Sequence, residues 1–309
     1  MDSQRQPASD HTAVNGPQTL EQLSRLLAEL KAGTAGLRLG KRALEVLDGM
    51  ITYPKQSAIC SISDLADNFG VNPSTLTRLA KSLGYKGFAE MQRVFRNYTA
   101  GTEHFYSLRA GQLFQHDQGH EGIHLASQIA NEETGNIASM LESLNSDTLD
   151  RVVDLLIQAP RIRIQGLRQS YPIANYLSYG LGLIRKDVAV LSVAQHGIIH
   201  GISQLEPGDL LFTIGSAPYT RSTVTASRVA REQGIEVVTI TDNHASPLAA
   251  SASYTFISPT SGSFFSNSMS ASLVLIEVLL SLVARKLGDQ ALDSLKHYEN
   301  LIGKTQVEI

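Results

Sequence analysis

Short polar side chains and closely spaced cations occur together in the segment LADNFGVNPSTLTRLAKSLGYKGF, which spans residues 65–88. Asn72 and Pro73 are typical of a helix start, because asparagine can cap free amide groups and proline needs no hydrogen-bond partner at the first helical position. Hydroxyl groups and arginine on the exposed face of such a helix can reach DNA phosphates and base edges. The candidate DNA-contacting residues are Asn72, Ser74, Thr75, Thr77, Arg78, Lys81 and Lys86.

The apolar and small residues around this segment have the spacing of a helix-turn-helix. Gly70 comes four residues after Ala66, where it would relieve strain in the turn, and Leu76 and Leu79 would seat the second helix. Between positions 71 and 98 the cations outnumber the single acid, Glu90; they are Arg78, Lys81, Lys86, Arg93 and Arg96. A structural helical hairpin with a solvated charged face is the alternative interpretation. Spacing, cap and charge bias together favour binding to a DNA phosphate backbone.

A second group of candidate residues lies where predicted strands end. The segments GLRQSY (166–171), GSAPYTRST (215–223) and TDNHASPLA (241–249) are rich in small and hydroxyl residues. In a doubly wound sheet, ligands bind beyond the carboxyl ends of the strands, where helix amides, hydroxyl groups and arginines can hold an anion. Serine and threonine cap helices more often than they bind ligands, but three such loops at one edge favour a binding site. The candidate effector-binding residues are Gly166, Arg168, Ser170, His196, Gly215, Ser216, Tyr219, Thr220 and Arg221.

Enzymatic and metal chemistry have weaker support in the sequence. His196 and His200 are four residues apart, the spacing of two ligands on a helix face, but no HExxH pattern accompanies them. We therefore expect no metal and no cofactor, and expect His196 to contact an organic ligand. No nucleophile elbow, P-loop or dinucleotide fingerprint is present, so we expect no enzyme. The alternatives are a sugar-phosphate isomerase with His196, His200 or Glu206 as general base, and a protein-interaction adaptor.

The elements that must position these residues change character along the chain. Apolar residues recur at helical spacing in five short segments before residue 98, whereas β-rich runs at 161–166, 187–192, 209–215, 236–241 and 253–258 alternate with amphipathic helical patterns. This alternation predicts a parallel sheet with right-handed crossovers. We expect a disordered tail (1–19), an all-α helix-turn-helix domain (20–98), a linker (99–121), an α/β three-layer domain with a five-stranded, mostly parallel sheet (122–303), and a tail (304–309).

Composition limits the classes of protein that fit. The formal net charge of −3 and the pI near 6.3 mean that attraction to nucleic acid must come from a local patch. Cys60 is the only cysteine, which excludes an intramolecular disulfide and a multi-cysteine zinc site and fits a reducing compartment. The polar stretch 1–19 does not fit a signal peptide, and the apolar run 271–284, which contains Glu277, is too short to span a bilayer. We expect a cytoplasmic protein that does not enter membranes.

The two halves together resemble the RpiR family of bacterial transcription regulators over about residues 20–301. The most specific segments are SISDLADNFGVNPSTLTRLAKSLGYKGFAEM (61–91), GLRQS (166–170), GDLLFTIGSAPYTRSTV (208–224) and AREQGIEVVTITDNHASPLA (230–249). The resemblance implies a helix-turn-helix domain followed by a SIS (sugar isomerase) domain that senses phosphosugars. It also implies a homodimer or homotetramer that binds a palindromic operator in double-stranded DNA, with half-sites about 34 Å apart or a multiple of that distance.

The two phosphate-binding loops depart from the family pattern. The first usually reads Gly-x-Gly-x-Ser, and here Arg168 replaces the second glycine while Ser170 is kept. The second usually reads Ser-x-Ser-(Gly or Pro)-x-(Ser or Thr), and here Gly215 and Ala217 replace the serines while Thr220 keeps its hydroxyl. Compensating contacts are expected from Arg168, Ser216 and Tyr219. The expected effector is a small anionic or sugar-phosphate molecule, with a carboxylate or an unphosphorylated polyol as alternatives.

Overall fold

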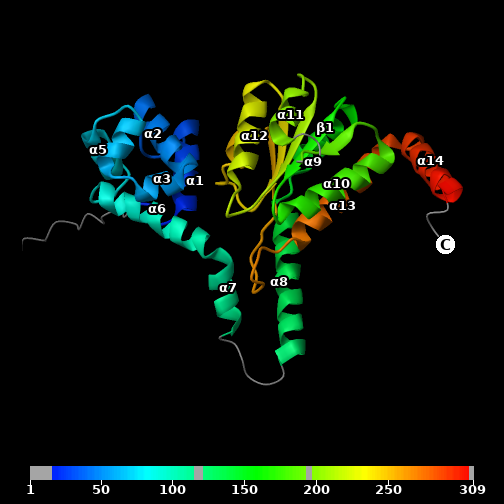
Figure 1. The fold of residues 1–309 in the computed structure, drawn as a ribbon, viewed down its shortest axis with the longest axis horizontal. Helices are drawn as coiled ribbons and strands as arrows, with labels where there is room; N and C mark the ends of the chain where they lie inside the picture. Colours follow the sequence, from blue (N-terminus) through cyan, green and yellow to red (C-terminus); the bar gives the residue numbers. More distant parts are fainter. Residues whose placement is uncertain (1–15, 115–120, 193–196, 306–309) are drawn as a thin grey trace, which may run out of the picture. The chain divides into compact units, whose positions relative to one another are not determined.

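The computed structural model describes residues 16–114, 121–192 and 197–305 (Figure 1). The chain divides into two compact units, Met1–Glu103 (the N-terminal unit) and His104–Ile309 (the C-terminal unit). Each unit has its own hydrophobic core.

The described part of the N-terminal unit is helical. Its helices are α1 (Leu20–Ala32), α2 (Lys41–Thr52), α3 (Pro54–Ile59), α4 (Ile62–Asn68), α5 (Pro73–Ser82) and α6 (Phe88–Glu103). Each amphipathic helix turns apolar residues toward one core, whose fully buried members include Leu23, Leu47, Met50 and Phe95. The sequence indicated five of these helices, and α3 is additional because its six residues are too few to show a period.

The C-terminal unit is built on a sheet with helices on both faces. Its elements are α7 (Phe105–Phe114), α8 (Glu121–Ser143), α9 (Ser146–Gln158), β1 (Ile162–Gly166), α10 (Ser170–Ile184), β2 (Val188–Val190), α11 (Gly197–Ser203), β3 (Leu210–Ile214), α12 (Arg221–Glu232), β4 (Glu236–Thr241), the 3-10 turn η2 (Ala249–Ser251), β5 (Tyr254–Ile257), α13 (Ser270–Leu287) and α14 (Asp289–Thr305). The strand order is β2-β1-β3-β4-β5, and all four strand pairs are parallel.

The strand order reverses direction between β1 and β3, which are neighbours in the sheet. The helix after β1, α10, packs in the larger core together with α9 and α13, whereas the helix after β3, α12, packs in a separate core with α11. The two helices therefore leave the same sheet edge toward opposite faces. Such a switch point opens a crevice at the carboxyl ends of the strands.

The expected fold class is confirmed: an all-α domain precedes an α/β layered domain with five strands, and the described sheet is parallel throughout. The structure differs from expectation over 99–121, because α6 continues to Glu103 and α7 occupies 105–114. Residues 16–19 also differ from the expected tail, since the Tyr85 hydroxyl donates to the Pro17 carbonyl (2.6 Å) and α1 is capped by Thr19. Residues 1–15, 115–120 and 306–309 of the expected tails and linker lie outside the described residues.

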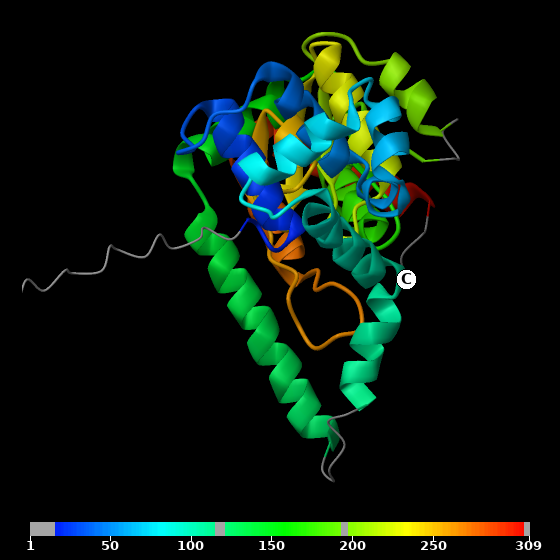
Figure 2. The same ribbon diagram turned by 90° about the vertical axis from the view of Figure 1, so that its left-hand side faces the viewer.

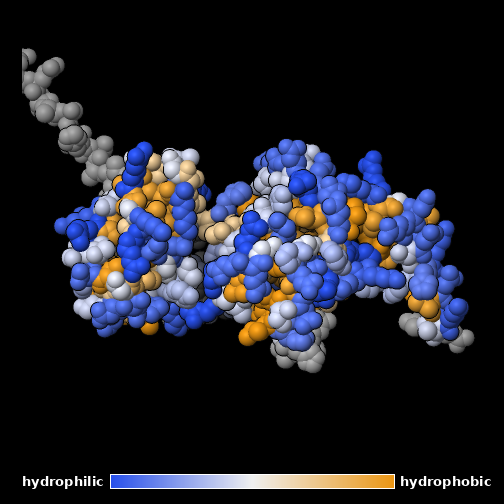
Figure 3. All heavy atoms as spheres, turned by 90° about the horizontal axis from the view of Figure 1, so that it is seen from above, coloured by the Kyte–Doolittle hydropathy of each residue, from blue (hydrophilic) through white to orange (hydrophobic). Residues whose placement is uncertain are grey.

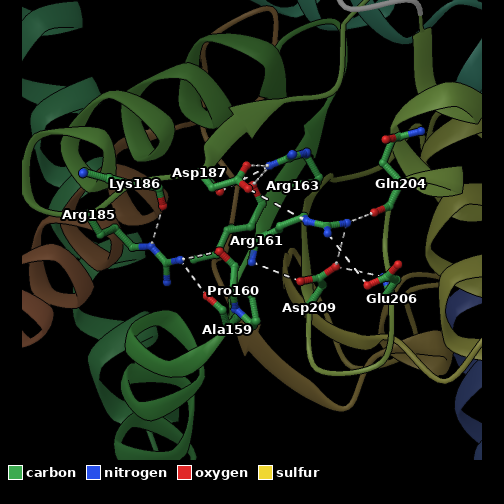
Figure 4. Close-up of polar contacts among 11 residues, drawn as sticks. Ala159, Pro160, Arg161, Arg163, Arg185, Lys186, Asp187, Gln204, Glu206 and Asp209 are labelled. Atoms are coloured by element: carbon green, nitrogen blue, oxygen red, sulfur yellow. Dashed lines mark hydrogen bonds and ion pairs between the residues drawn. The ribbon is translucent and has the colours of Figure 1, made fainter.

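Charged residues form ion pairs and hydrogen bonds between the amino ends of β1, β2 and β3 (Figure 4). Arg161 precedes β1, and its guanidinium lies 3.7 Å from Asp209, which precedes β3. Arg163 Nη1 donates to Asp187 Oδ1 (2.7 Å), just before β2. These contacts fix the edge of the sheet that is opposite the candidate ligand loops.

Helix α14 follows α13 and packs against α10 and α13. Its side chains Leu292, Tyr298 and Leu301 are exposed, and apolar surface interrupts the hydrophilic surface at the α14 end of the C-terminal unit (Figure 3). No helix within the described residues is both long enough and apolar enough to cross a membrane.

Candidate DNA interface and effector site

Helices α4 and α5 form the expected helix-turn-helix. Gly70 has a φ of 58°, the left-handed conformation that glycine adopts without steric cost, and it closes α4 by donating to the Asp67 carbonyl (3.0 Å). Pro73 is the first residue of α5, and Leu76 and Leu79 are buried beneath it. The chemistry predicted for the turn and for the seating of α5 is therefore confirmed.

The candidate DNA-contacting residues lie mostly on the open surface of α5. Asn72, Ser74, Arg78, Lys81 and Lys86 are exposed, whereas Thr75 and Thr77 are half-buried. The predicted capping role of the Asn72 side chain is wrong: Asn72 occupies the N-cap position, but its side chain makes no capping hydrogen bond. Its backbone carbonyl instead accepts from the Thr75 amide (2.8 Å).

The five cations of this region fall into two groups. The first group has partners within the N-terminal unit. The Arg96 guanidinium donates to the Ala58 carbonyl (3.1 Å) and to Gln92 Oε1 (2.7 Å), and the Arg93 guanidinium lies 3.7 Å from the Glu90 carboxylate. The side chains of the other cations make no hydrogen bond or ion pair with the described residues; these are Arg78, Lys81 and Lys86. The positive charge that remains available for phosphate therefore lies on and just after α5.

Glu90 is already engaged, because its carboxylate accepts the Lys86 amide at the start of α6 (2.5 Å). The sequence did not predict a contact between α2 and the turn of the helix-turn-helix: Arg42 on α2 donates to the Phe69 carbonyl (2.5 Å), where α4 ends. Lysine and arginine commonly bind the last carbonyls of helices. Because 27 residues separate Arg42 from Phe69, no local pattern in the sequence indicates the contact.

The three predicted ligand loops meet at the carboxyl edge of the sheet, as their order in the chain implied. They border two adjoining pockets, both open to solvent. Gly215 and Ser216 line both pockets, and so does Ser170 at the start of α10. The first pocket also reaches Asp242 after β4, and the second reaches Thr220 at the start of α12.

A fourth loop, which connects β5 to α13 (258–269), completes the wall and was not predicted. It lies between α7 and α8 (Figure 2), and its residues Ser258, Thr260, Asn267 and Ser268 line the first pocket. The stretch SPTSGSFFSNSM follows the fifth predicted strand at the same sheet edge, so the rule that selected the other loops would have found it.

Asn267 holds this fourth loop against the others. Its amide nitrogen donates to Ser216 Oγ (2.9 Å) and to the Ala217 carbonyl (2.7 Å), and its backbone amide donates to Gln169 Oε1 (3.2 Å). Asn267 therefore links the loops that follow β1, β3 and β5. The positions of the pocket walls are set by this network of neutral hydrogen bonds.

The predicted effector residues have different roles. Gly166 lines neither pocket; a Cβ there would lie 2.5 Å from the Ser170 carbonyl oxygen, so glycine permits the close approach of α10 to β1. Tyr219 donates its hydroxyl to Asp242 (2.6 Å), and Arg221 begins α12 without lining either pocket. His196 lies outside the described residues.

Arg168 has a left-handed backbone conformation, with a φ of 55°. This conformation is rare for residues with a Cβ and costs roughly 1–3 kcal/mol, so it is found mainly where the surrounding structure demands it. The exposed guanidinium donates to the Tyr106 hydroxyl (2.6 Å) and lies near the Pro218 carbonyl (3.4 Å). It also lies 5.6 Å from the centre of the Tyr106 ring.

Asp242 brings a carboxylate to the pocket, and its role was missed although it lies in a quoted loop. It accepts from Tyr219 and from the Thr241 hydroxyl (3.1 Å). One end of the site thus has a cation, Arg168, and the other end has the Asp242 carboxylate, a hydrogen-bond acceptor that is surrounded by hydroxyl groups. This arrangement can hold a molecule that carries both an anionic group and hydroxyl groups.

Of the three residues nominated for isomerase chemistry, the two that the structure describes lie away from the pockets. Glu206 belongs to the charged network at the opposite edge of the sheet, and His200 on α11 lines neither pocket. Among the residues that the structure describes, no three potential metal ligands come together.

Comparison with known proteins identifies both units. The family model of the SIS domain matches residues 155–282, and that of the rpiR-family helix-turn-helix domain matches residues 35–101. The chain thus combines a DNA-binding type of domain with a sugar-isomerase type of domain. With these two domains in this order, it belongs to the RpiR family of transcriptional regulators.

Relatives and solved structures agree with this assignment. The chain is 29% identical to the HTH-type transcriptional regulator HexR of Pseudomonas aeruginosa over 212 residues. This alignment covers 68% of the chain and 71% of HexR. It resembles the sugar isomerase domain of an RpiR transcription factor from Sphaerobacter thermophilus (24% identity, TM-score 0.54, 57% of this chain and 98% of that one). It also resembles Vibrio vulnificus NanR complexed with ManNAc-6P (21% identity, TM-score 0.54, 92% and 100% covered). At these identities the two structures support the fold.

Proposed function

We propose that this protein is a transcriptional regulator that binds an operator in double-stranded DNA through α5 and a small effector through the loops of its SIS domain. The observation that carries the DNA-binding part is the position of Arg78, Lys81 and Lys86. They are exposed on or just after the second helix of a helix-turn-helix, and their side chains have no partner among the described residues. Because the whole chain is slightly acidic, this local patch supplies the attraction to phosphate.

The recognition helix would enter the major groove with its amino-terminal residues toward the base edges. Arg78 would contact a base, whereas Lys81 and Lys86 would contact phosphates. A homodimer would place two such helices on a palindromic operator, in the cytoplasm. The chain would act without turning over its effector, as the names of its relatives as transcriptional regulators suggest.

The effector part rests on the pocket residues. Arg168 supplies positive charge, and hydroxyl groups of Ser170, Ser216 and Thr220 supply neutral hydrogen bonds along the same wall. A sugar phosphate or a sugar acid matches this combination. The complex of NanR with ManNAc-6P supports a phosphosugar as the first compound to test.

Substitution of single cations tests the assignment on α5. Arg78→Ala should weaken binding to the preferred DNA by about 5- to 150-fold, the equivalent of about 1–3 kcal/mol for a base contact, and weaken binding to scrambled DNA much less. Lys81→Ala should weaken both and lower the salt dependence of binding by about one unit of logarithmic slope. Lys31→Ala is the matched control, because Lys31 is paired with Asp48 (3.0 Å) on the N-terminal unit. Equal losses on both DNAs would make Arg78 a phosphate contact.

A further inference from the structure

Two arginines connect helix α7 to the loops of the effector site by hydrogen bonds. Arg168 donates to the hydroxyl of Tyr106 on α7 (2.6 Å) and has its guanidinium carbon 5.6 Å from the ring centre. Arg109, also on α7, donates to the Ser266 carbonyl (2.5 Å) in the loop that forms the pocket wall. The ring of Tyr106 is part of the lining of the second pocket. Helix α7 is therefore one wall of the ligand site as well as a connecting segment.

The place of α7 in the chain gives this contact a consequence. Helix α7 begins at Phe105, two residues after Glu103, where the N-terminal unit with its helix-turn-helix ends. Tyr106 therefore lies in a segment that is joined almost directly, along the chain, to the end of α6. Among the described residues that line the pockets, no other lies so near the N-terminal unit along the chain.

The present partners of Arg168 are a hydroxyl group, on Tyr106, and a backbone carbonyl, on Pro218 (3.4 Å), neither of which is a carboxylate or a phosphate. A guanidinium binds carboxylate or phosphate oxygens in a paired, charge-assisted geometry that is about twice as strong as neutral hydrogen bonding. Arg168 is also exposed, so an anion can reach it from solvent. An anionic group that enters the second pocket will hence compete successfully with the Tyr106 hydroxyl.

We propose that Tyr106 is a residue of the effector site, and that an anionic oxygen of the effector, from either a phosphate or a carboxylate, takes Arg168 from its hydroxyl and releases α7. This inference rests on the proposed function of the pocket. It adds the class of group that the Arg168 end binds and names the contact that the bound group replaces. Arg168, which stands where the family has glycine, thus becomes the residue that couples the ligand to the connecting helix.

Two substitutions probe this contact without removing the fold. Tyr106→Phe keeps the ring and deletes only the competing hydroxyl. Arg168→Gly restores the residue best suited to a φ of 55° and deletes the guanidinium. Tyr179→Phe is the matched control, because Tyr179 is exposed on α10 and lines neither pocket.

The experiment measures affinity by calorimetry and backbone protection of residues 105–114 by hydrogen–deuterium exchange, on the full chain. The probes are inorganic phosphate and glucose 6-phosphate for the phosphate source, gluconate for the carboxylate source, and glucose as the neutral comparison. We expect at least one anion, but not glucose, to bind and to raise exchange in α7. Tyr106→Phe should bind that anion roughly fivefold more tightly, the equivalent of one neutral hydrogen bond. Arg168→Gly should bind it at least tenfold more weakly, and exchange in α7 should be higher than in the unaltered protein without anion and should not change when the anion is added, although Arg109 still binds the Ser266 carbonyl.

Three results would overturn the proposal: no binding of any anion, binding without a change in α7, or equal affinities for Tyr106→Phe, Tyr179→Phe and the unaltered protein. Titration of the same variants on DNA separates this failure from that of the proposed function. Sequence-preferring DNA binding with an unresponsive α7 would refute only the Tyr106 contact. Absence of DNA binding would refute the regulator itself.

Discussion

Replacing Asp209 by alanine should destabilise the C-terminal unit far more than replacing Glu206, although both carboxylates face Arg161 (Figure 4). The Asp209 side chain is only 4% exposed, and it accepts the backbone amides of Arg161 (3.1 Å) and Glu206 (2.8 Å). The Glu206 carboxylate is 76% exposed, and its one ion pair with the described residues is with the Arg161 guanidinium, at 3.8 Å.

These geometries give very different magnitudes. Hydrogen bonds to a charged acceptor contribute about 1.5–3 kcal/mol each, so loss of the Asp209 carboxylate should cost about 3 kcal/mol after some relaxation. An exposed ion pair contributes less than about 1 kcal/mol, which bounds the effect of Glu206→Ala. For a unit of this size the unfolding temperature should fall by roughly 6–12 °C for Asp209→Ala and by less than about 3 °C for Glu206→Ala.

Scanning calorimetry of the full chain measures both shifts on the transition of the C-terminal unit. Asp209→Asn should lie between the two, because an amide keeps one acceptor oxygen but loses the charge. Equal shifts for Asp209→Ala and Glu206→Ala would contradict this prediction, because they would mean that the ion pairs, and not the buried backbone hydrogen bonds, dominate this edge.

Three further predictions concern single contacts. Gly70→Ala should lower the stability of the N-terminal unit by about 1 kcal/mol, seen as a lower unfolding temperature, because a side chain is strained at a φ of 58°. Gly166→Ala should cost about 1–3 kcal/mol in the C-terminal unit by the same measurement, since its Cβ would lie 2.5 Å from the Ser170 carbonyl oxygen. The hydrogen bond from the Ser263 hydroxyl holds the pKa of the Glu132 carboxyl below its ordinary value of 4.5. This contact therefore stabilises the fold above pH 4.5 and is lost as the pH falls through the lowered pKa, so the protection factor of the Ser263 amide should drop there.

Specific results would contradict each of these three predictions. Unchanged unfolding temperatures for the two glycine variants would mean that the backbone relaxes around the new side chains. For Glu132 the control is Glu132→Gln, which does not titrate. The same loss of Ser263 protection in Glu132→Gln at acid pH would assign the effect to another group.

The strands and the principal helices were accessible from the sequence because their apolar periods are strong. Every described strand falls inside a predicted β-rich run, and Arg221 begins α12 as its loop suggested. The convergence of three loops followed from one rule, that parallel strands present their carboxyl ends at one edge. Helix α7 was missed since its turns carry mixed residues, including the glycine and glutamine of LRAGQ.

The contacts that define the site were less accessible, because they depend on residues that are far apart in the chain. Asn267 bonds to Ser216 across 51 residues, and Arg168 bonds to Tyr106 across 62. Substitution of the family's glycine by Arg168 marked the position as unusual, but neither its left-handed backbone nor its partner follows from local pattern. At Asn72 the residue type suits a cap, and Asn72 does occupy the N-cap position, but its side chain makes no capping hydrogen bond.

DNA binding by this protein is tested most directly by a binding titration of the purified chain on the intergenic DNA upstream of its own gene, against scrambled DNA of equal length, at two salt concentrations. We expect tighter binding to the upstream DNA and a steep loss of affinity as the salt concentration rises, because counterions are released when Arg78, Lys81 and Lys86 contact the phosphate backbone of the DNA. Absence of binding to either DNA at the lower salt concentration would contradict this expectation.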